Sequence, residues 1–481
     1  MEKLIFEKSH SGRRAYSLPK LDVETINLKD EIPNQYIRQN PCELPEVSEI
    51  EIARHFQRLS HLNYNIEKGI YPLGSCTMKY NPKANEKAAS YDGFANIHPF
   101  MPENHTQGAL QLMYELSKDL VEITGMDGVT LQPAAGAAGE FTGIMMIRAY
   151  HLDRGDVKRT KIMIPDSAHG TNPASAAIAG FQIVNVKSDE HGRVDIEDFK
   201  SKLNDEVAAL MLTNPNTLGI FEKNICVIEK ALHEAGALLY MDGANLNALI
   251  GIAQPGKFGV DALHINLHKT FSTPHGGGGP GAGPVVVSER LLPYLPVPQI
   301  KFADGIYNFD YNLPKSIGKV HTFFGNFLVL VRAYNYIKML GKEGIYRTSS
   351  GAILNANYLK SLVKDYFEFP FDEQSMHEFV MSGDRQKKRG VTTMEMVKRL
   401  LDYGYHAPTV YFPLIVHEAL LVEPTETETK ESLEEFAQAL IAIDKEIDEN
   451  PELVKTAPHT TPVKRINDAY AARNLNVCWK E

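Results

Sequence analysis

Short apolar runs alternate with longer, helix-length segments between residues 160 and 290. The connecting segments include helix-length pieces at 195–203 and 225–235. This alternation is typical of βαβ units, whose parallel strands are buried on both faces. The sequence therefore predicts an α/β domain built on a mostly parallel sheet. The expected strands are 161–165, 182–186, 208–212, 238–241, 262–267 and 284–287.

The part of the chain before this alternation has a different character. Residues 1–100 are rich in proline and asparagine, with one clear helix at 48–58. A segment of this kind needs another surface to lie against, so we expect an N-terminal arm. A helix at 106–124 follows, with an apolar stripe through Leu112, Leu116 and Leu120. This spacing of four residues is that of an amphipathic helix, which opens the predicted large domain at 101–325.

A smaller C-terminal domain is expected at 326–481. A long helical stretch begins near residue 323 and leads through Gly341 into this domain. The tetrapeptide Thr392–Glu395 is a capping box that starts a further helix, and Gly404 ends it. No internal repeat or low-complexity tract is present.

A single lysine, Lys269, follows the apolar run 262–267, and a glycine stretch at 275–281 comes soon after it. A lysine amine forms an imine with an aldehyde cofactor only when it can lose its proton, which partial burial and nearby positive charge favour. His268 and the apolar Phe271 provide such surroundings. A nucleotide P-loop does not fit, because the lysine precedes the glycines. A Schiff-base lysine and a structural loop both remain open.

Two further polar residues end strands of the predicted sheet. Asp242 ends the run that begins at Leu238, at the carboxyl edge where ligands of open α/β sheets bind. A carboxylate there can keep a pyridinium nitrogen protonated, although Asp-Gly is also a common turn. His169 follows the strand 161–165, where an imidazole can stack on a planar ring or simply be structural. The combination of His169, Asp242 and Lys269 at three strand ends favours a cofactor site.

A loop of small residues, 131–141, leads into an apolar helical stretch and offers a place for a phosphate group. The backbone N–H groups of Ala135, Gly136 and Ala137 can point at an anion, with the helix dipole behind them. Small residues at a helix start also occur simply for close packing. The loop is therefore consistent with a cofactor phosphate without proving one.

Four segments of the chain together resemble one family: Tyr71–Pro82, Asp166–Ala174, Asp242–Asn245 and His268–Lys269. They are similar to glycine dehydrogenase (decarboxylating), the P-protein of the glycine cleavage system. The resemblance covers most of the chain. Its length and its lysine resemble subunit 2 of the two-subunit form, in which a related subunit 1 lacks the Schiff-base lysine.

The resemblance implies the aspartate-aminotransferase fold (fold type I), with a large domain and a small C-terminal α+β domain, and pyridoxal 5'-phosphate as cofactor. Lys269 is then the Schiff-base lysine, His169 the ring-stacking residue and Asp242 the pyridinium partner. The loop from Ala135 through Gly136 to Ala137 becomes the phosphate cup, although Ala134 and Ala135 offer no hydroxyl group. Asn214 is expected to face the ring hydroxyl. Asn245 and His268 complete the expected cofactor-binding set, and no metal site is expected.

The activity implied by the resemblance is decarboxylation of glycine, with transfer of the aminomethyl group to the lipoyl arm of H-protein. Subunit 1 is an expected partner, in a heterotetramer. Other pyridoxal-phosphate enzymes of this fold, such as cysteine desulfurases or amino-acid decarboxylases, would use the same lysine, histidine and aspartate. Only the segment Tyr71–Pro82 and the N-terminal arm argue against them. A non-catalytic subunit would not need Lys269.

Composition excludes several other classes. The net charge of −10 and the pI near 6.0 argue against a nucleic-acid partner, and the basic run Arg385–Arg389 is expected to be a solvated loop. No transmembrane run or secretory signal is present, so we expect no membrane partner and a cytoplasmic protein. The four cysteines lie far apart without a C-x-x-C pair, which fits reduced thiols.

Overall fold

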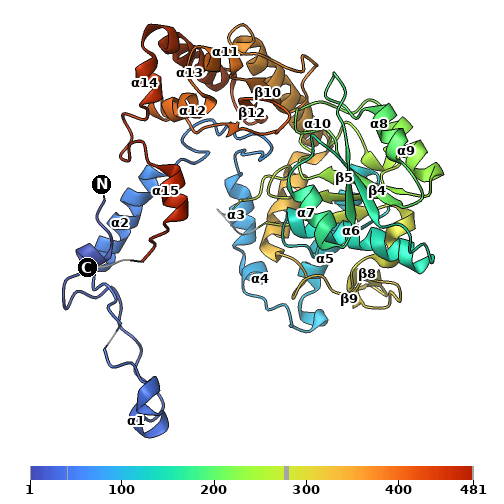
Figure 1. Cartoon of the computed structure of the whole chain (residues 1–481). Helices are drawn as coiled ribbons and strands as arrows, with labels where there is room; N and C mark the ends of the chain where they lie inside the picture. Colours follow the sequence, from blue (N-terminus) through green and yellow to red (C-terminus); the bar gives the residue numbers. More distant parts are fainter. Residues whose placement is uncertain (1, 41, 276–280, 479–481) are drawn as a thin grey trace. The chain divides into compact units, whose positions relative to one another are not determined.

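The computed structural model describes residues 2–40, 42–275 and 281–478 (Figure 1). Two compact units make up the chain. One unit contains Met1–Lys68 together with Thr460–Glu481, and the other contains Gly69–His459. The glycine stretch at 276–280, which the sequence analysis singled out, lies outside the described residues.

A seven-stranded sheet forms the centre of the larger unit among its described residues, with strand order β1-β7-β6-β5-β4-β2-β3. β7 is antiparallel to both of its neighbours, and the other pairs are parallel. The predicted mostly parallel sheet is therefore confirmed. Its strands are β1 (Gly128–Thr130), β2 (Lys161–Pro165), β3 (Gln182–Val186), β4 (Val207–Thr213), β5 (Leu238–Gly243), β6 (Ala262–Ile265) and β7 (Val285–Val287).

Alternate side chains of the central strands enter two different apolar clusters, because successive residues of a strand point to opposite faces. On β5, Leu238 and Tyr240 join the cluster of α6 (Gly136–Asp153) and α7 (Thr171–Ile178). Leu239 and Met241 join the opposite cluster. Helices thus cover both faces of the sheet, which explains why its strands read as continuous apolar runs. The helices of the second cluster are α5 (Gln107–Thr124), α8 (Ile196–Lys202), α9 (Ile225–Glu234) and the first half of α10 (Phe327–Val363).

The predicted helices at 106–124, 195–203 and 225–235 correspond closely to α5, α8 and α9. The long helical stretch predicted after residue 323 corresponds to α10. The helix continues past Gly341 to Val363, and Gly341 forms a non-helical kink within it, with φ +60°. Glycine adopts this φ without the steric cost that a Cβ imposes, so the chain bends there and remains helical on both sides.

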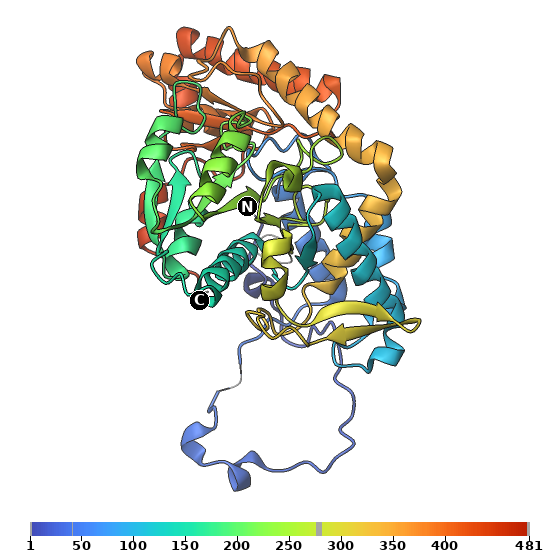
Figure 2. The same ribbon diagram turned by 90° about the vertical axis from the view of Figure 1, so that its right-hand side faces the viewer.

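A hairpin of β8 (Gln299–Ala303) and β9 (Ile306–Asp310) packs on α5 (Figure 2). It follows β7 and the short 3-10 helix η5 (Glu289–Tyr294). No sequence pattern had indicated this hairpin.

The C-terminal part of the larger unit has its own small sheet and apolar cluster. The antiparallel strand order is β10-β12-β11, formed by Phe379–Ser382, Ala419–Val422 and Thr409–Val410. Helices α12 (Thr393–Asp402) and α13 (Lys430–Glu449) supply much of the cluster. The capping box is confirmed, because the Thr392 hydroxyl accepts from the Glu395 N–H and the Glu395 carboxylate accepts from the Thr392 N–H. The domain boundaries at 100 and 325 remain predictions.

The basic run Arg385–Arg389 is not a loop, as the sequence had suggested. Its first four residues lie in a short helix, α11 (Asp384–Lys388). Gln386 is buried and donates to Asp444, while Arg389 forms ion pairs with Asp444 and Asp448. Anchoring to the acidic face of α13 turns the segment into a helix, although Arg385, Lys387 and Lys388 remain exposed.

The smaller unit contains little apolar core. Its main helix, α2 (Glu49–Leu62), begins with a capping box formed by Ser48 and Glu51, as the predicted helix at 48–58 required. Within the described residues 2–68, Val47 is the one apolar side chain that is buried. Shorter helices in this unit are α1 (Leu28–Glu31), α15 (Asp468–Arg473) and the 3-10 turns Phe6–Lys8 and Asn34–Tyr36.

Residues 69–100 belong to the larger unit and carry more helix than predicted. α3 (Lys83–Ala89) packs on α10, and α4 (Asp92–Ala95) follows it. The chain then turns through Glu103–His105 into α5, and α14 (Pro451–Lys455) follows α13 at the other end of the unit. Among the described residues, no helix is both long and apolar enough to cross a membrane.

Candidate active site

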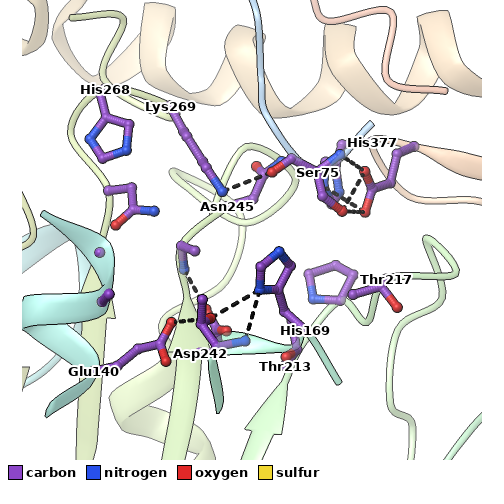
Figure 3. A pocket seen from close by; sticks show the side chains of 17 residues that line it. Ser75, Glu140, His169, Thr213, Thr217, Asp242, Asn245, His268, Lys269 and His377 are labelled. Atoms are coloured by element: carbon purple, nitrogen blue, oxygen red, sulfur yellow. Dashed lines mark hydrogen bonds and ion pairs between the residues drawn. The ribbon is translucent and has the colours of Figure 1, made fainter. Parts of the chain in front are cut away.

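A pocket of about 260 Å³ opens at the carboxyl ends of β2, β4, β5 and β6 (Figure 3). This is the edge at which open α/β sheets bind ligands. Lys269 and His268 enter from one side of the pocket, and Asp242 and Glu140 lie on the opposite side. The lining residues are Ser75, Gly136, Ala137, Glu140, His169, Thr171, Thr213, Pro215, Thr217, Asp242, Ala244, Asn245, Asn266, His268, Lys269, His377 and Glu378.

The Lys269 side chain projects into the pocket from the turn after β6. The flanking residues Leu267 and Phe271 are fully buried, so they fix the turn from which the lysine extends. The amine Nζ donates to the carbonyl oxygen of Ser75 at 2.8 Å. The amine is therefore held in a defined place by a residue distant in sequence.

Asp242 is the last residue but one of β5 and is 3% exposed. Its carboxylate accepts from Asn172 Nδ2 and from the Ala244 N–H, both at 2.9 Å, and Oδ1 lies 3.4 Å from His264 Nε2. Burial by itself raises the pKa of Asp242, but the His264 imidazole and these donors together lower it below the ordinary value. The carboxylate is thus ionised at the floor of the pocket.

His169 lies in the turn between β2 and α7, with its ring exposed on the pocket side. Ring atom Nδ1 lies 2.9 Å from Thr171 Oγ1, and that hydroxyl donates to Glu140 Oε1 at 2.7 Å. Enough protein surrounds the ring that desolvation, followed by the positive charge of Lys269, lowers the pKa of His169. A neutral, anchored imidazole suits stacking on a flat ring better than a charged one.

The N-terminus of α6 reaches the pocket at Gly136 and Ala137, and no side chain caps it at Ala135. Its first N–H groups and the dipole of an 18-residue helix are therefore available to an anion. A Cβ on Gly136 would stand 2.6 Å from Asn266 Oδ1, so any other residue there would force the Asn266 side chain to move. The predicted phosphate loop is brought into the same pocket as Lys269.

Buried polar atoms without a partner among the described residues gather at this pocket. They include His268 Nδ1, Asn266 Oδ1 and Thr213 Oγ1, all on lining residues. Burial, followed by the charge of a neighbouring histidine, lowers the pKa of His268 to about 3, so its ring is neutral. Unsatisfied buried polar groups are rare unless a ligand meets them. The pocket thus fits a planar, phosphorylated aldehyde cofactor.

The predicted cofactor residues Asn245 and Asn214 differ in whether they line the pocket. Asn245 lines the pocket and donates through Nδ2 to Glu423. Asn214 is fully buried beside the pocket without lining it, and its Oδ1 accepts from the Glu222 N–H. Its neighbour Thr213 reaches the pocket instead. No local pattern in the sequence separates Thr213 from its neighbour Asn214.

Sequence reasoning missed several lining residues: Ser75, Glu140, Thr213, His377 and Glu378. Ser75 lies in the segment Tyr71–Pro82, which supported the family resemblance but had been assigned no role in the site. His377 and Glu378 directly precede β10, about a hundred residues after Lys269, and no local motif surrounds them. The described residues also contain two buried groups with metal-ligand chemistry, Glu140 with Asp242 and His264, and His377 with Glu378 and Glu423.

The fold is that of fold type I pyridoxal-phosphate enzymes. A crystal structure of glycine decarboxylase (P-protein) of the glycine cleavage system in inhibitor-bound form superposes with a TM-score of 0.72 at 19% identity, over 86% of this chain and 94% of the other. The cysteine desulfurase CsdA from Escherichia coli superposes with a TM-score of 0.60 at 12% identity, over 81% and 98% of the two chains. At these identities the likeness concerns the fold.

The chain belongs to the glycine cleavage system P-protein family. The model of that family matches residues 9–300, and the model of the glycine dehydrogenase C-terminal domain matches residues 348–465. A relative in Chlorobium phaeobacteroides, described as probable glycine dehydrogenase (decarboxylating) subunit 2, is 59% identical over 99% of both chains. A relative of the same description in Caldanaerobacter subterraneus subsp. tengcongensis is 58% identical over 99% of this chain and 98% of its own.

Proposed function

We propose that this chain is the lysine-bearing subunit of a pyridoxal-phosphate-dependent glycine decarboxylase that passes the aminomethyl group to the lipoyl arm of H-protein. One observation carries the proposal within this family. Lys269, Asp242, His169 and the free N-terminus of α6 line a single pocket, although they come from four separate segments. Those are the groups needed for the aldehyde, the ring nitrogen, the ring face and the phosphate of that cofactor.

Each group has a role that follows from its surroundings. Lys269 holds the cofactor covalently through its amine, and Asp242, ionised and fixed by Asn172, keeps the ring nitrogen protonated. His169 covers one face of the ring, and the N–H groups at Gly136 and Ala137 bind the phosphate. When bound, the cofactor acts as an electron sink for the pair of electrons left on the substrate carbon as carbon dioxide departs.

The remaining predicted cofactor residues are assigned from their positions. His268 offers an unpartnered ring nitrogen beside Lys269, and Asn245 lines the wall next to it. Thr213 is better placed than Asn214 to meet the ring hydroxyl, because its Oγ1 belongs to a lining residue and has no partner among the described residues.

Subunit 1 and lipoylated H-protein are the proposed protein partners. The N-terminal segment supports an obligate complex, because it presents apolar side chains such as Tyr16, Leu18 and Leu21 that are at least 70% exposed. Such side chains gain stability by lying on a neighbour, over an interface on the order of 2,000 Å² or more. A heterotetramer in the cytoplasm is the assembly and location that we propose.

Exchange of label between bicarbonate and glycine tests the function directly. The chain mixed with subunit 1 and H-protein should catalyse the exchange, and Asp242→Asn should slow it by at least about a hundredfold, because loss of a specific electrostatic partner in a buried site typically costs 10²–10³ in rate. Exchange at the wild-type rate in Asp242→Asn would remove the proposed role of that carboxylate. Absence of exchange in the complete wild-type mixture would reject the function.

A further inference from the structure

Two buried glutamates meet at the pocket wall near Lys269. Glu378 directly precedes β10, and Glu423 directly follows β12, the antiparallel partner of β10. They are 2% and 0% exposed, and an oxygen of each lies within 4.8 Å of the other and of a ring nitrogen of His377. Two carboxylates this close in a buried place repel each other strongly when both are ionised.

The hydrogen-bond donors are divided unequally between the two carboxylates. Glu423 accepts from the Thr77 N–H at 2.9 Å, from Thr77 Oγ1 at 2.7 Å and from Asn245 Nδ2 at 2.9 and 3.0 Å. Both of its oxygens are therefore covered by donors, as an ionised carboxylate requires.

Glu378 has fewer donors. Oε2 accepts from the Ser75 N–H at 2.6 Å, and Ser75 Oγ lies farther away, 3.2 Å from Oε1 and 3.3 Å from Oε2. Oε1 therefore has no short donor among the described residues, which leaves room for a proton on that oxygen. Burial, followed by the negative charge of Glu423, raises the pKa of Glu378 well above its ordinary value.

The surrounding titratable groups add one positive charge. Burial also raises the pKa of Glu423, and the positive charge of the Lys269 amine lowers the pKa of both glutamates. Burial lowers the pKa of His377 to about 3 and that of His275 to about 4, so both rings are neutral, and burial raises the pKa of the Cys76 thiol. Two ionised glutamates would leave an excess negative charge here, and one proton removes it.

A metal ion does not fit the same place. The two oxygens of Glu423 already accept four hydrogen bonds, from the Thr77 N–H, Thr77 Oγ1 and Asn245 Nδ2, which leaves no lone pair for a metal ion. A proton on Glu378 requires no lone pair of Glu423.

We propose that Glu378 carries a proton at neutral pH while Glu423 is ionised, and that this neutral and charged pair positions Ser75 against the amine of Lys269. The backbone geometry of Ser75 and Thr77 supports the proposed positioning of Ser75 directly. Ser75 and Thr77 have φ of +61° and +51°, a region that residues other than glycine seldom adopt. Glu378 and Glu423 hold these two residues, and the Ser75 carbonyl accepts from Lys269 Nζ.

The pair gives a physical role to the segment Tyr71–Pro82. The two glutamates come from the C-terminal part of the chain, and each anchors one residue of this segment. Lys79 of the same segment is buried and is anchored in a similar way, through an ion pair of 2.8 Å with Glu426. Glu378 and Glu423 are thus positioning residues, and their link to Lys269 rests on the proposed function, whereas the protonation of Glu378 does not.

Infrared spectroscopy of the full chain without cofactor tests the protonation. The C=O stretching band of a protonated carboxyl group at neutral pH should be present in the wild type and lost in Glu378→Gln. Glu418→Gln is the matched control, because Glu418 is also buried but pairs with Lys387, and it should retain the band. A wild-type spectrum identical to that of Glu378→Gln would overturn the proposal.

Thermal unfolding of the same variants distinguishes the two glutamates. Glutamine resembles a protonated glutamate, so Glu378→Gln should unfold at nearly the wild-type temperature. Glu423→Gln should unfold at a lower temperature or fail to fold, because an amide N–H₂ group would face the donors of Thr77 and Asn245. A Glu378→Gln protein that is destabilised as much as Glu423→Gln would overturn the proposal.

The link to Lys269 is measured by titration with pyridoxal phosphate, followed by visible absorbance. Glu378→Gln should bind nearly as the wild type, and Glu378→Ala at least about tenfold more weakly, because Ser75 loses its anchor. Wild-type affinity in Glu378→Ala would remove the positioning role and leave the infrared result intact. A wild type that binds no cofactor would instead reject the proposed function, and the infrared test would still decide the protonation.

Discussion

The amine of Lys269 has one direct hydrogen-bond acceptor among the described residues, the Ser75 carbonyl. Another lysine of the chain could not take the place of Lys269. The buried residues Leu267 and Phe271 fix the point from which its side chain extends into the pocket. The proposed covalent role of Lys269 is therefore specific to this position.

Replacing Lys269 with alanine is expected to abolish covalent cofactor capture. Mass spectrometry of peptides after borohydride reduction with pyridoxal phosphate checks this, and the wild type should carry the label on the peptide that contains Lys269. Lys230→Ala is the control, because that side chain is 74% exposed and forms only a long ion pair of 3.9 Å with Glu234 among the described residues. A labelled peptide in Lys269→Ala would mean that another lysine binds the cofactor.

Helix α6 contributes to the pocket and to the core at the same time. Its N-terminus offers free N–H groups, while Ile144 and Ile147 lie in the cluster beneath the sheet. Because the helix is anchored along its length, a small change at its start should act on ligand binding before it acts on folding.

Gly136→Ala is expected to weaken pyridoxal phosphate binding at least about tenfold, because the new Cβ would stand 2.6 Å from Asn266 Oδ1 and displace the N–H groups. Gly108→Ala is the matched control, a glycine at the start of α5 with open space around it. That change should leave affinity intact and stabilise the helix by up to about 1 kcal/mol. Equal affinity in the two variants, measured by titration, would contradict the assignment of the phosphate site.

His151 links α6 to the sheet and makes the free energy of unfolding depend on pH. His151 Nε2 lies 3.0 Å from the Ala208 carbonyl of β4, and burial lowers the pKa of this ring to about 4. The folded pKa is below the unfolded one, so the unfolded chain binds more protons in mild acid. The stabilisation is complete above about pH 6.5 and is lost as the pH falls towards 4.

Between pH 7 and pH 5 this histidine is expected to account for at most about 2 kcal/mol of lost stability. In His151→Gln the free energy of unfolding should fall less over that interval, by a similar amount. Glutamine does not titrate, and its amide can still donate to the Ala208 carbonyl. Urea unfolding at pH 8, 7 and 5 measures this, and the two proteins should behave alike between pH 8 and 7. An undiminished loss between pH 7 and 5 would show that His151 is not responsible.

The whole molecule pairs a well-packed unit with a segment that has almost no core of its own. The described residues 2–68 bury a single apolar side chain, Val47, whereas the larger unit contains several apolar clusters. Conformational entropy disfavours an ordered segment that buries so little, so a partner surface is needed to stabilise it.

Assembly with subunit 1 should therefore depend on the exposed apolar residues of this segment. Leu18 and Leu21 are 81% and 70% exposed. Replacing both with glutamate is expected to weaken the affinity for subunit 1 at least about tenfold and to leave the circular dichroism spectrum unchanged. Leu414→Glu is the control, an apolar side chain of the larger unit that is 86% exposed. Sedimentation of the mixed subunits measures the effect, and a double variant that assembles like wild type would exclude this segment from the interface.

Local signals in the sequence determined much of this protein. Apolar runs with helices between them predicted six of the seven strands of the central sheet, all but β1, because burial of both faces leaves a continuous apolar pattern. The same runs placed His169, Asp242 and Lys269 at strand ends, and parallel strands bring their carboxyl ends to one edge. The basic run at 385–389 was predicted wrongly as a loop, since contacts of Gln386 and Arg389 with α13 accompany a helix there, and no sequence pattern had indicated the kink at Gly341.

Only the tertiary structure decided which distant residues meet around Lys269. Ser75 and Glu378 are 303 positions apart, and Thr77 and Glu423 are 346 apart, yet each pair is joined by hydrogen bonds. No periodicity relates such positions, because their contact depends on how β10 and β12 pack beside the segment Tyr71–Pro82. The sequence alone singled out Lys269 as the candidate Schiff-base lysine, whereas the buried carboxylates that hold its surroundings became visible only when the chain was folded.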